Sequence, residues 1–93
     1  MYLLVLSKNY KRSYNLLLKS GRKNDIKKLE QVVDMILAGK LLDKKFQDHK
    51  LNGKLSDYKE CHIKTDFLLI YKKDKEKKIL FLFNIGNHND LFE

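Results

Sequence analysis

The chain opens with a short apolar run over residues 2–6, whose length and composition predict a β-strand. Ser7 follows as the expected N-cap of a helix that runs to about Ser20, with Gly21 just past its end. Apolar side chains recur along this helix at positions i, i+4, i+7 and i+8, which predicts one buried stripe: Tyr10, Tyr14, Leu17 and Leu18. The other side is polar and largely basic: Lys8, Lys11, Arg12, Asn15 and Lys19. The segment is therefore predicted to be an amphipathic helix with a basic outer face.

A second helix is predicted to begin at Asn24 or Asp25 and to end near Ala38, where Gly39 stops it. Its apolar stripe has helical spacing: Ile26, Leu29, Val33, Ile36 and Leu37. Only the short segment 21–23 separates the two helices, so we expect them to form an antiparallel helical hairpin.

The second half of the chain has the pattern of a β-sheet. Helical periodicity disappears from residue 40 to about 55, where an ordered loop is expected. Residues 58–63 then alternate, with Cys61 and Ile63 on one face and Glu60 and His62 on the other. Continuous apolar runs over residues 67–72 and 79–85 are typical of central strands, and the polar turns 64–66 and 73–77 make the three strands an antiparallel meander. A short tail, 87–92, follows Gly86.

The predicted order is β-α-α-β-β-β, an α+β fold in which a two-helix hairpin packs on one face of a curved, mainly antiparallel four-stranded sheet. A length of 93 residues suits one small domain, residues 1–93. Apolar residues make up 43% of the chain, which is enough for a packed core and too much for disorder. Large multi-domain enzymes, repeat arrays and coiled coils are therefore excluded.

The charge balance indicates a polyanionic partner. The chain carries 20 Lys and Arg against 12 Asp and Glu, a net charge of +8, which favours nucleic acid or an acidic protein as ligand. The alternative is a lysine-rich surface that serves solubility alone. Arg12 and Arg22 are the only arginines, so lysine point charges are expected to make most phosphate contacts.

Composition also limits the setting. Cys61 is the single cysteine, which excludes an internal disulfide and fits a reducing cytoplasm. We see no zinc-type spacing, no apolar run near the roughly 20 residues of a membrane-spanning helix, and no basic leader or cleavage site of a signal peptide. We therefore expect a cytoplasmic protein with no metal, no other cofactor and no membrane contact.

All three histidines lie in the second half of the chain: His49, His62 and His88. Three carboxylates accompany them: Asp48, Glu60 and Asp66. Antiparallel pairing across the 64–66 turn brings Asp66 close to His62. Imidazole gives or takes a proton near neutral pH, so two or three such rings with a carboxylate suit phosphodiester cleavage. Nearby lysines would stabilise the charged phosphorane.

Other interpretations of these residues stay open. Three histidines are also about what chance supplies in 93 residues, as surface or structural side chains. Two histidines and an aspartate can hold a metal ion. Phe92 either stacks on a base or pins the tail to the core. The Cys61 thiol is expected to be buried and inert, the lysine-rich run 72–78 to be a solvated hairpin tip, and the basic face of the first helix either to be solvated or to dock on RNA.

Four blocks of the sequence resemble the YafQ-type toxins of the RelE/ParE superfamily, which belong to bacterial type II toxin–antitoxin systems. The blocks are residues 48–53 (DHKLNG), 58–63 (YKECHI), 66–71 (DFLLIY) and 86–92 (GNHNDLF). The resemblance spans essentially the whole chain, including its β-α-α opening. It implies a fold similar to microbial ribonucleases and a metal-independent endoribonuclease that cuts mRNA in the ribosomal A site and arrests translation.

The resemblance also implies roles for individual residues. The catalytic set would be His49, His62, Asp66 and His88. By analogy, Asp66 would be the general base and His88 the general acid, while His49 and His62 orient and stabilise the scissile phosphate; His62 and Asp66 could exchange roles. Four residues would bind substrate: Phe92, Phe67, Asn84 and Lys50. Four basic residues of the first helix would dock on ribosomal RNA: Lys8, Lys11, Arg12 and Lys19.

Two positions depart from the family pattern. The family commonly has Trp after the catalytic aspartate, where this chain has Phe67, which keeps an apolar wall and loses the indole N–H donor. It commonly has Arg two residues before the glycine of the last strand, where this chain has Asn84. A phosphate-binding guanidinium is therefore missing, so either a nearby lysine compensates or the enzyme is weak.

The implied partners are a cognate antitoxin, the ribosome with mRNA in its A site, and operator DNA through the antitoxin alone. Two other functions stay open on the same fold. One is a ParE-like inhibitor of DNA gyrase, against which the complete histidine and aspartate set argues. The other is a catalytically weakened toxin that acts as an antitoxin-bound corepressor, which Phe67 and Asn84 favour.

Overall fold

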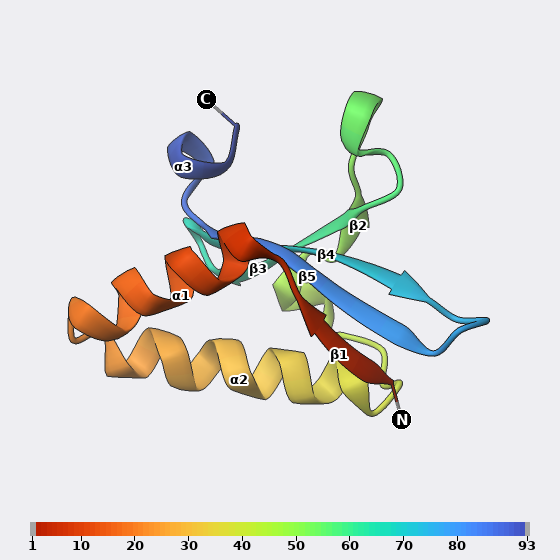
Figure 1. Ribbon diagram of the computed structural model, residues 1–93, viewed down its shortest axis with the longest axis horizontal. Helices are drawn as coiled ribbons and strands as arrows, with labels where there is room; N and C mark the ends of the chain where they lie inside the picture. Colours follow the sequence, from red (N-terminus) through yellow and green to blue (C-terminus); the bar gives the residue numbers. More distant parts are fainter. Residues whose placement is uncertain (1, 93) are drawn as a thin grey trace.

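The computed structural model describes residues 2–92, whose elements follow the predicted order (Figure 1). The elements are β1 (Leu3–Leu6), α1 (Lys8–Lys19), α2 (Lys23–Leu37), a short 3-10 turn η1 (Lys44–Phe46), β2 (His49–Lys50), a second 3-10 turn η2 (Gly53–Leu55), β3 (Lys59–Lys64), β4 (Phe67–Asp74), β5 (Ile79–Gly86) and α3 (His88–Phe92). The predicted strands end within two residues of the observed ones, and the predicted tail forms one turn of helix.

The sheet has five strands within residues 2–92, in the order β1-β5-β4-β3-β2, rather than the four predicted. β3, β4 and β5 form the expected antiparallel meander, and β1 pairs in parallel with β5. The additional strand, β2, lies in the segment predicted to be a loop, and its two residues pair with Lys59 and Glu60. Two residues are too short to show a period, so the strand state of β2 depends on the neighbouring edge of β3.

Each long helix begins where the chain supplies hydrogen-bond partners. Ser7 caps α1 as predicted, because its hydroxyl accepts the Tyr10 amide at 2.9 Å and donates to the Phe83 carbonyl. α2 begins at Lys23, slightly before the predicted start, and its N-cap residue makes no side-chain cap. Asp25 instead accepts hydrogen bonds from Arg22 Nε at 2.8 Å and Lys64 Nζ at 2.8 Å. These contacts connect the start of α2 to the end of β3.

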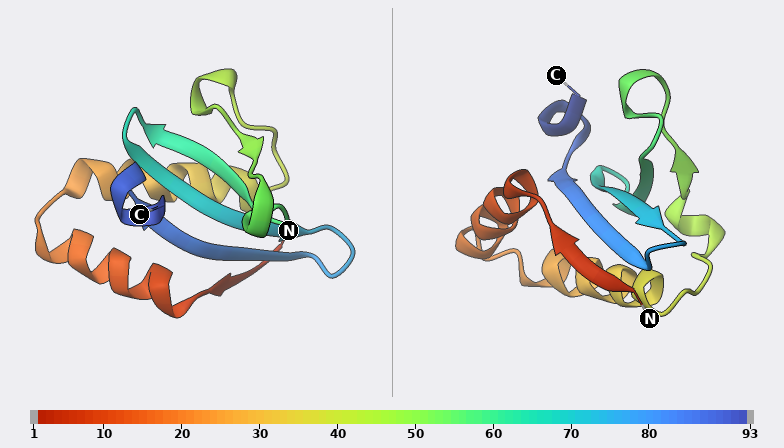
Figure 2. Two further views of the ribbon diagram at one scale, coloured as in Figure 1. Left: turned by 90° about the horizontal axis from the view of Figure 1, so that it is seen from above. Right: turned by 45° about the vertical axis from the view of Figure 1, so that its right-hand side comes forward.

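Both long helices lie against one face of the sheet, whereas α3 and η2 project from the opposite face (Figures 1 and 2). The predicted stripe of α1 is only partly buried: Tyr10 and Leu17 are 5% and 7% exposed, whereas Leu18 is 50% exposed. Val32, absent from the predicted stripe of α2, is buried because it lies three residues after Leu29 on the same helical face. No helix within residues 2–92 is long and apolar enough to cross a membrane.

Replacing Asp25 with asparagine is expected to lower the free energy of unfolding by about 1–3 kcal/mol, because two cations lose the charge they share. Lys64 and then Arg22 hold the pKa of Asp25 below its ordinary value. A lowered pKa in the folded state stabilises the fold above the pKa of the unfolded chain, and this stabilisation is lost as the pH falls through the folded-state pKa. Urea unfolding should therefore show the difference between wild type and Asp25→Asn shrinking below about pH 4.

Asp34→Asn is the matched control for this comparison, because Asp34 is an exposed carboxylate on the same helix. It should change stability by no more than about 0.5 kcal/mol. A difference between wild type and Asp25→Asn that stays constant from neutral to acidic pH would contradict the role of the Asp25 charge.

Candidate active site

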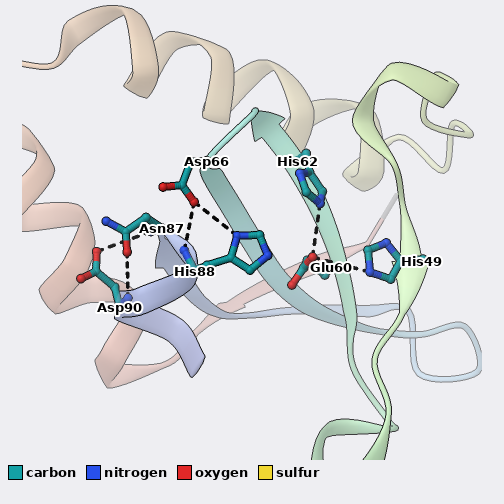
Figure 3. A network of polar contacts seen from close by, with 7 residues as sticks. All are labelled: His49, Glu60, His62, Asp66, Asn87, His88 and Asp90. Atoms are coloured by element: carbon teal, nitrogen blue, oxygen red, sulfur yellow. Dashed lines mark hydrogen bonds and ion pairs between the residues drawn. The ribbon is translucent and has the colours of Figure 1, made fainter. Parts of the chain in front are cut away.

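The structure brings the four predicted catalytic residues together on the sheet face opposite the long helices (Figure 3). His49 lies on β2, His62 on β3, Asp66 in the turn after β3, and His88 at the start of α3. The imidazole centroids of His49 and His62 are 6.2 Å apart, and those of His62 and His88 are 6.1 Å apart. The Phe92 ring follows, 5.9 Å from that of His88. Four rings therefore form one row, which the sequence could not establish for His49.

A buried carboxylate lies between two of these histidines. Glu60 Oε1 is 3.3 Å from His62 Nε2 and 3.5 Å from His49 Nε2, and its side chain is 5% exposed. Alternation along the strand predicts that Glu60 lies on the same face as His62, but Glu60 is not among the predicted catalytic residues. Strand alternation was the available signal. The missing information was the pairing of His49 with Glu60 across β2 and β3, which places both rings beside one carboxylate.

Backbone and side-chain contacts fix His49 on its other side. His49 Nδ1 donates to the Gln47 carbonyl at 2.6 Å, so both ring nitrogens face acceptors. The preceding residue, Asp48, accepts hydrogen bonds from the Tyr71 hydroxyl at 2.5 Å and from Lys59 Nζ at 2.6 Å. Asp48 therefore anchors the start of β2 to β3 and β4, which helps to hold the neighbouring His49 in place.

The start of α3 positions His88. Asn87 Oδ1 accepts the Asp90 amide at 2.8 Å, and Asp90 Oδ2 accepts the Asn87 amide at 3.4 Å, which is a reciprocal cap of the kind that starts helices (Figure 3). Gly86 is needed just before it, because it has φ of +156° and a Cβ there would lie 3.1 Å from Asp90 Cβ. The conformation of Gly86 and the cap formed by Asn87 and Asp90 thus orient His88 toward the sheet.

Asp66 holds His88 from the other side. Its Oδ1 accepts the His88 backbone N–H at 3.2 Å and the ring Nδ1–H at 3.3 Å. The His88 backbone amide, and then its ring, lower the pKa of Asp66, so this carboxylate is ionised at neutral pH. Both side chains are more than half exposed, so substrate can reach them.

The predicted substrate-binding residues fall in two places. Phe92 is 43% exposed beside His88, and Lys50 is exposed on β2 next to His49. Phe67 and Asn84 instead line a groove of about 830 Å³ between α1 and the sheet, which also contains Asp66. Phe67 is only 3% exposed, because it packs in the core below this groove. The basic residues predicted to dock on RNA are all exposed on α1: Lys8, Lys11, Arg12 and Lys19.

Cys61 is fully buried, and burial raises the pKa of its thiol, as expected for an inert cysteine. No group of three or more His, Cys, Asp or Glu side chains in the part of the chain that the structure describes is arranged to hold a metal ion.

Comparison with known proteins gives one consistent family. The family model described as "Bacterial toxin of type II toxin-antitoxin system, YafQ" matches residues 2–93. The mRNA interferase toxin YafQ of Escherichia coli is 32% identical over 76 residues, which cover 81% of this chain and 80% of that protein. A metal-bound toxin from Helicobacter pylori is 38% identical with a TM-score of 0.89, over 99% of this chain and 100% of that chain.

A YafQ chain in the E. coli DinJ–YafQ complex is 26% identical with a TM-score of 0.87, and both chains are covered completely. The family model spans nearly the whole chain, and the solved structures agree with the fold described above. The chain therefore belongs to the YafQ family of bacterial type II toxin–antitoxin toxins.

Proposed function

We propose that this chain is an mRNA interferase, a ribosome-dependent endoribonuclease that cuts mRNA without a metal ion and so arrests translation. The observation that carries the proposal is the row of three imidazoles about 6 Å apart, each held by an acceptor, on an open face of the sheet. The E. coli relative named as an mRNA interferase supports the same reaction.

The proposed reaction is an internal transfer followed by release of the downstream strand. A general base takes the proton of the ribose 2′-OH, whose oxygen attacks the adjacent phosphorus. The bond from phosphorus to the 5′ oxygen breaks, and a general acid protonates that oxygen. The products are a 2′,3′-cyclic phosphate and a 5′-hydroxyl, with no net change in protons.

We assign His88 as the acid and His62 as the base. As general acid, His88 acts in its doubly protonated form, in which Nδ1–H donates to Asp66 and Nε2–H is the proton for the leaving oxygen. His62 faces Glu60 through Nε2, so Nδ1 has the lone pair that accepts the 2′-OH proton. Asp66 is the weaker candidate for the base, since its pKa is lowered and it contacts His88 directly. In-line displacement needs the acid and the base on opposite sides of the phosphate.

Glu60 then has a positioning role. It faces both His49 and His62, and its charge stabilises the positive charge that His62 gains with the proton. Glu60→Gln keeps the shape and removes the charge, so we expect cleavage to fall about tenfold to a hundredfold, the equivalent of one charged hydrogen bond. Glu76→Gln, at the exposed hairpin tip, is the matched control. Equal rates for both variants, measured by primer extension, would remove Glu60 from the mechanism.

The proposed partners follow from the charge and the family. The net charge of +8 suits capture by an acidic antitoxin segment and docking on ribosomal RNA through Lys8, Lys11, Arg12 and Lys19. A relative crystallised as a DinJ–YafQ complex supports the antitoxin partner. Operator DNA would be reached through that antitoxin.

The deciding experiment is primer extension on a reporter mRNA in a bacterial translating extract. The proposal expects cuts at in-frame codon positions, on translated message only. Cuts on a message that lacks a start codon would remove the ribosome from the proposal. Intact message would reject the nuclease, and arrest of replication before translation would then favour gyrase inhibition.

A further inference from the structure

The groove beside Asp66 contains a positive site that the catalytic row does not use. Arg22, Lys64 and Asp66 all line this groove of about 830 Å³. Asp66 also contacts His88, so the groove and the candidate active site meet at Asp66. An RNA strand that lies across the histidines can therefore extend into it.

The two cations of this positive site share one buried carboxylate. Asp25 is only 5% exposed. Its Oδ2 accepts a hydrogen bond from Arg22 Nε at 2.8 Å and lies 2.5 Å from Nη2 of the same guanidinium. Its Oδ1 accepts a hydrogen bond from Lys64 Nζ at 2.8 Å. The Arg22 guanidinium also lies over the Phe67 ring, 5.7 Å from its centroid. One carboxylate thus holds two cations, leaving one net positive charge, while the Arg22 and Lys64 side chains stay 54% and 46% exposed.

Three other polar side chains of the groove already have hydrogen-bond partners. Asn84, where the resemblance predicts an arginine, accepts the Ser13 hydroxyl at 2.7 Å and the Ile85 amide at 2.9 Å through the same oxygen. Asp66 accepts a hydrogen bond from the His88 amide, and Asp90 accepts one from the Asn87 amide. Arg22 and Lys64 are the cations that line the groove within residues 2–92.

We propose that Arg22 and Lys64, both paired with Asp25, form a phosphate subsite. It binds a phosphate of the RNA strand that neighbours the phosphate at which the strand is cut. The subsite takes over part of the electrostatic role that Asn84 cannot fill, since a guanidinium binds phosphate through paired N–H donors. Its contribution is binding and alignment of the strand rather than proton transfer. This inference rests on the proposed nuclease function.

The test uses a fully 2′-O-methylated single-stranded RNA oligonucleotide, which lacks the attacking hydroxyl and stays uncut. Binding is measured by fluorescence anisotropy over a series of salt concentrations. Arg22→Gln should weaken binding about tenfold at low salt and reduce the slope of log K against log salt by about 0.7, the value for one lost phosphate contact. Lys23→Gln removes the same charge from the adjacent, exposed residue outside the groove and should change binding much less.

Two further measurements separate this subsite from a structural role. Amide resonances of groove residues, followed by NMR, should shift in wild type on addition of the oligonucleotide and shift less in Arg22→Gln. Arg22→Lys, which keeps a cation near Asp25, should recover part of the affinity, with binding compared at a temperature at which every variant is folded. Equal losses for Arg22→Gln and Lys23→Gln, or no binding by wild type, would overturn the subsite.

The same variants in the translating extract distinguish the subsite from the nuclease function. If wild type leaves message intact while the oligonucleotide binds in the groove, the nuclease proposal is wrong, whereas phosphate binding by Arg22 and Lys64 stands. If wild type cuts and Arg22→Gln cuts and binds equally well, the subsite is wrong and the nuclease stands. A higher toxin concentration for half-cleavage by Arg22→Gln, with Lys23→Gln unchanged, supports both.

Discussion

His88→Ala is expected to reduce mRNA cleavage about a hundredfold to ten-thousandfold, the range for loss of a general acid. The fold should survive, because the His88 side chain is 57% exposed and lies outside the hydrophobic core. Without it, the 5′ oxygen must leave as an unprotonated alkoxide. Primer extension at a series of toxin concentrations measures the loss, and thermal unfolding checks the fold.

His88→Asn separates the two tasks of this residue. Its amide nitrogen can replace Nδ1 as the donor to Asp66, so α3 keeps its anchor. It has no group that can protonate the leaving oxygen, so it should be as inactive as His88→Ala. Substantial activity in His88→Asn would show that the residue acts through Asp66 and the backbone, and that another group is the acid.

His62→Gln is expected to cost about a hundredfold or more in cleavage, because the general base is lost while a donor toward Glu60 is kept. The choice of glutamine matters, since His62 is only 15% exposed at its side chain and a cavity would also affect stability. Across β3 and β4, Leu68 pairs with His62 and Ile70 pairs with Glu60. Both are buried, and their packing should preserve the shape of the site in the variant.

The double variant His62→Gln/His88→Ala tests whether the two residues act in one step. Groups that act as a unit give losses that are far from additive, so the double variant should be little slower than the worse single variant. Asp66→Asn provides the comparison for the alternative base. A loss with Asp66→Asn that exceeds the loss with His62→Gln would return the base role to Asp66.

Much of the fold follows from local pattern in the sequence. The two helices were predictable because burial of one helical face imposes a 3.6-residue spacing, visible at Leu29, Val33 and Ile36. Ser7 was predictable as a cap because its hydroxyl serves an amide only three residues away. The strands of the meander were predictable because central strands carry continuous apolar runs, and residues 67–71 of β4 are all buried. The same local character made the histidine-containing blocks recognisable as those of a toxin family.

The site itself depends on contacts between distant segments. His49 reaches the row only because a two-residue strand pairs with β3, and no periodicity in the sequence announces so short a strand. Alternation along β3 predicts the face on which Glu60 lies. Its position between two imidazoles, however, requires the register in which β2 pairs with β3. Asp25 looked like a helix cap in the sequence, yet in the fold it holds Arg22 and Lys64, the latter from the far end of β3. The sequence by itself determined the two long helices, the strands of the meander and the chemical groups, because these are properties of short segments. Only the tertiary structure decided which groups share a carboxylate or a groove, because charge and hydrogen-bond interactions act over a few ångströms and depend on the register in which the segments meet.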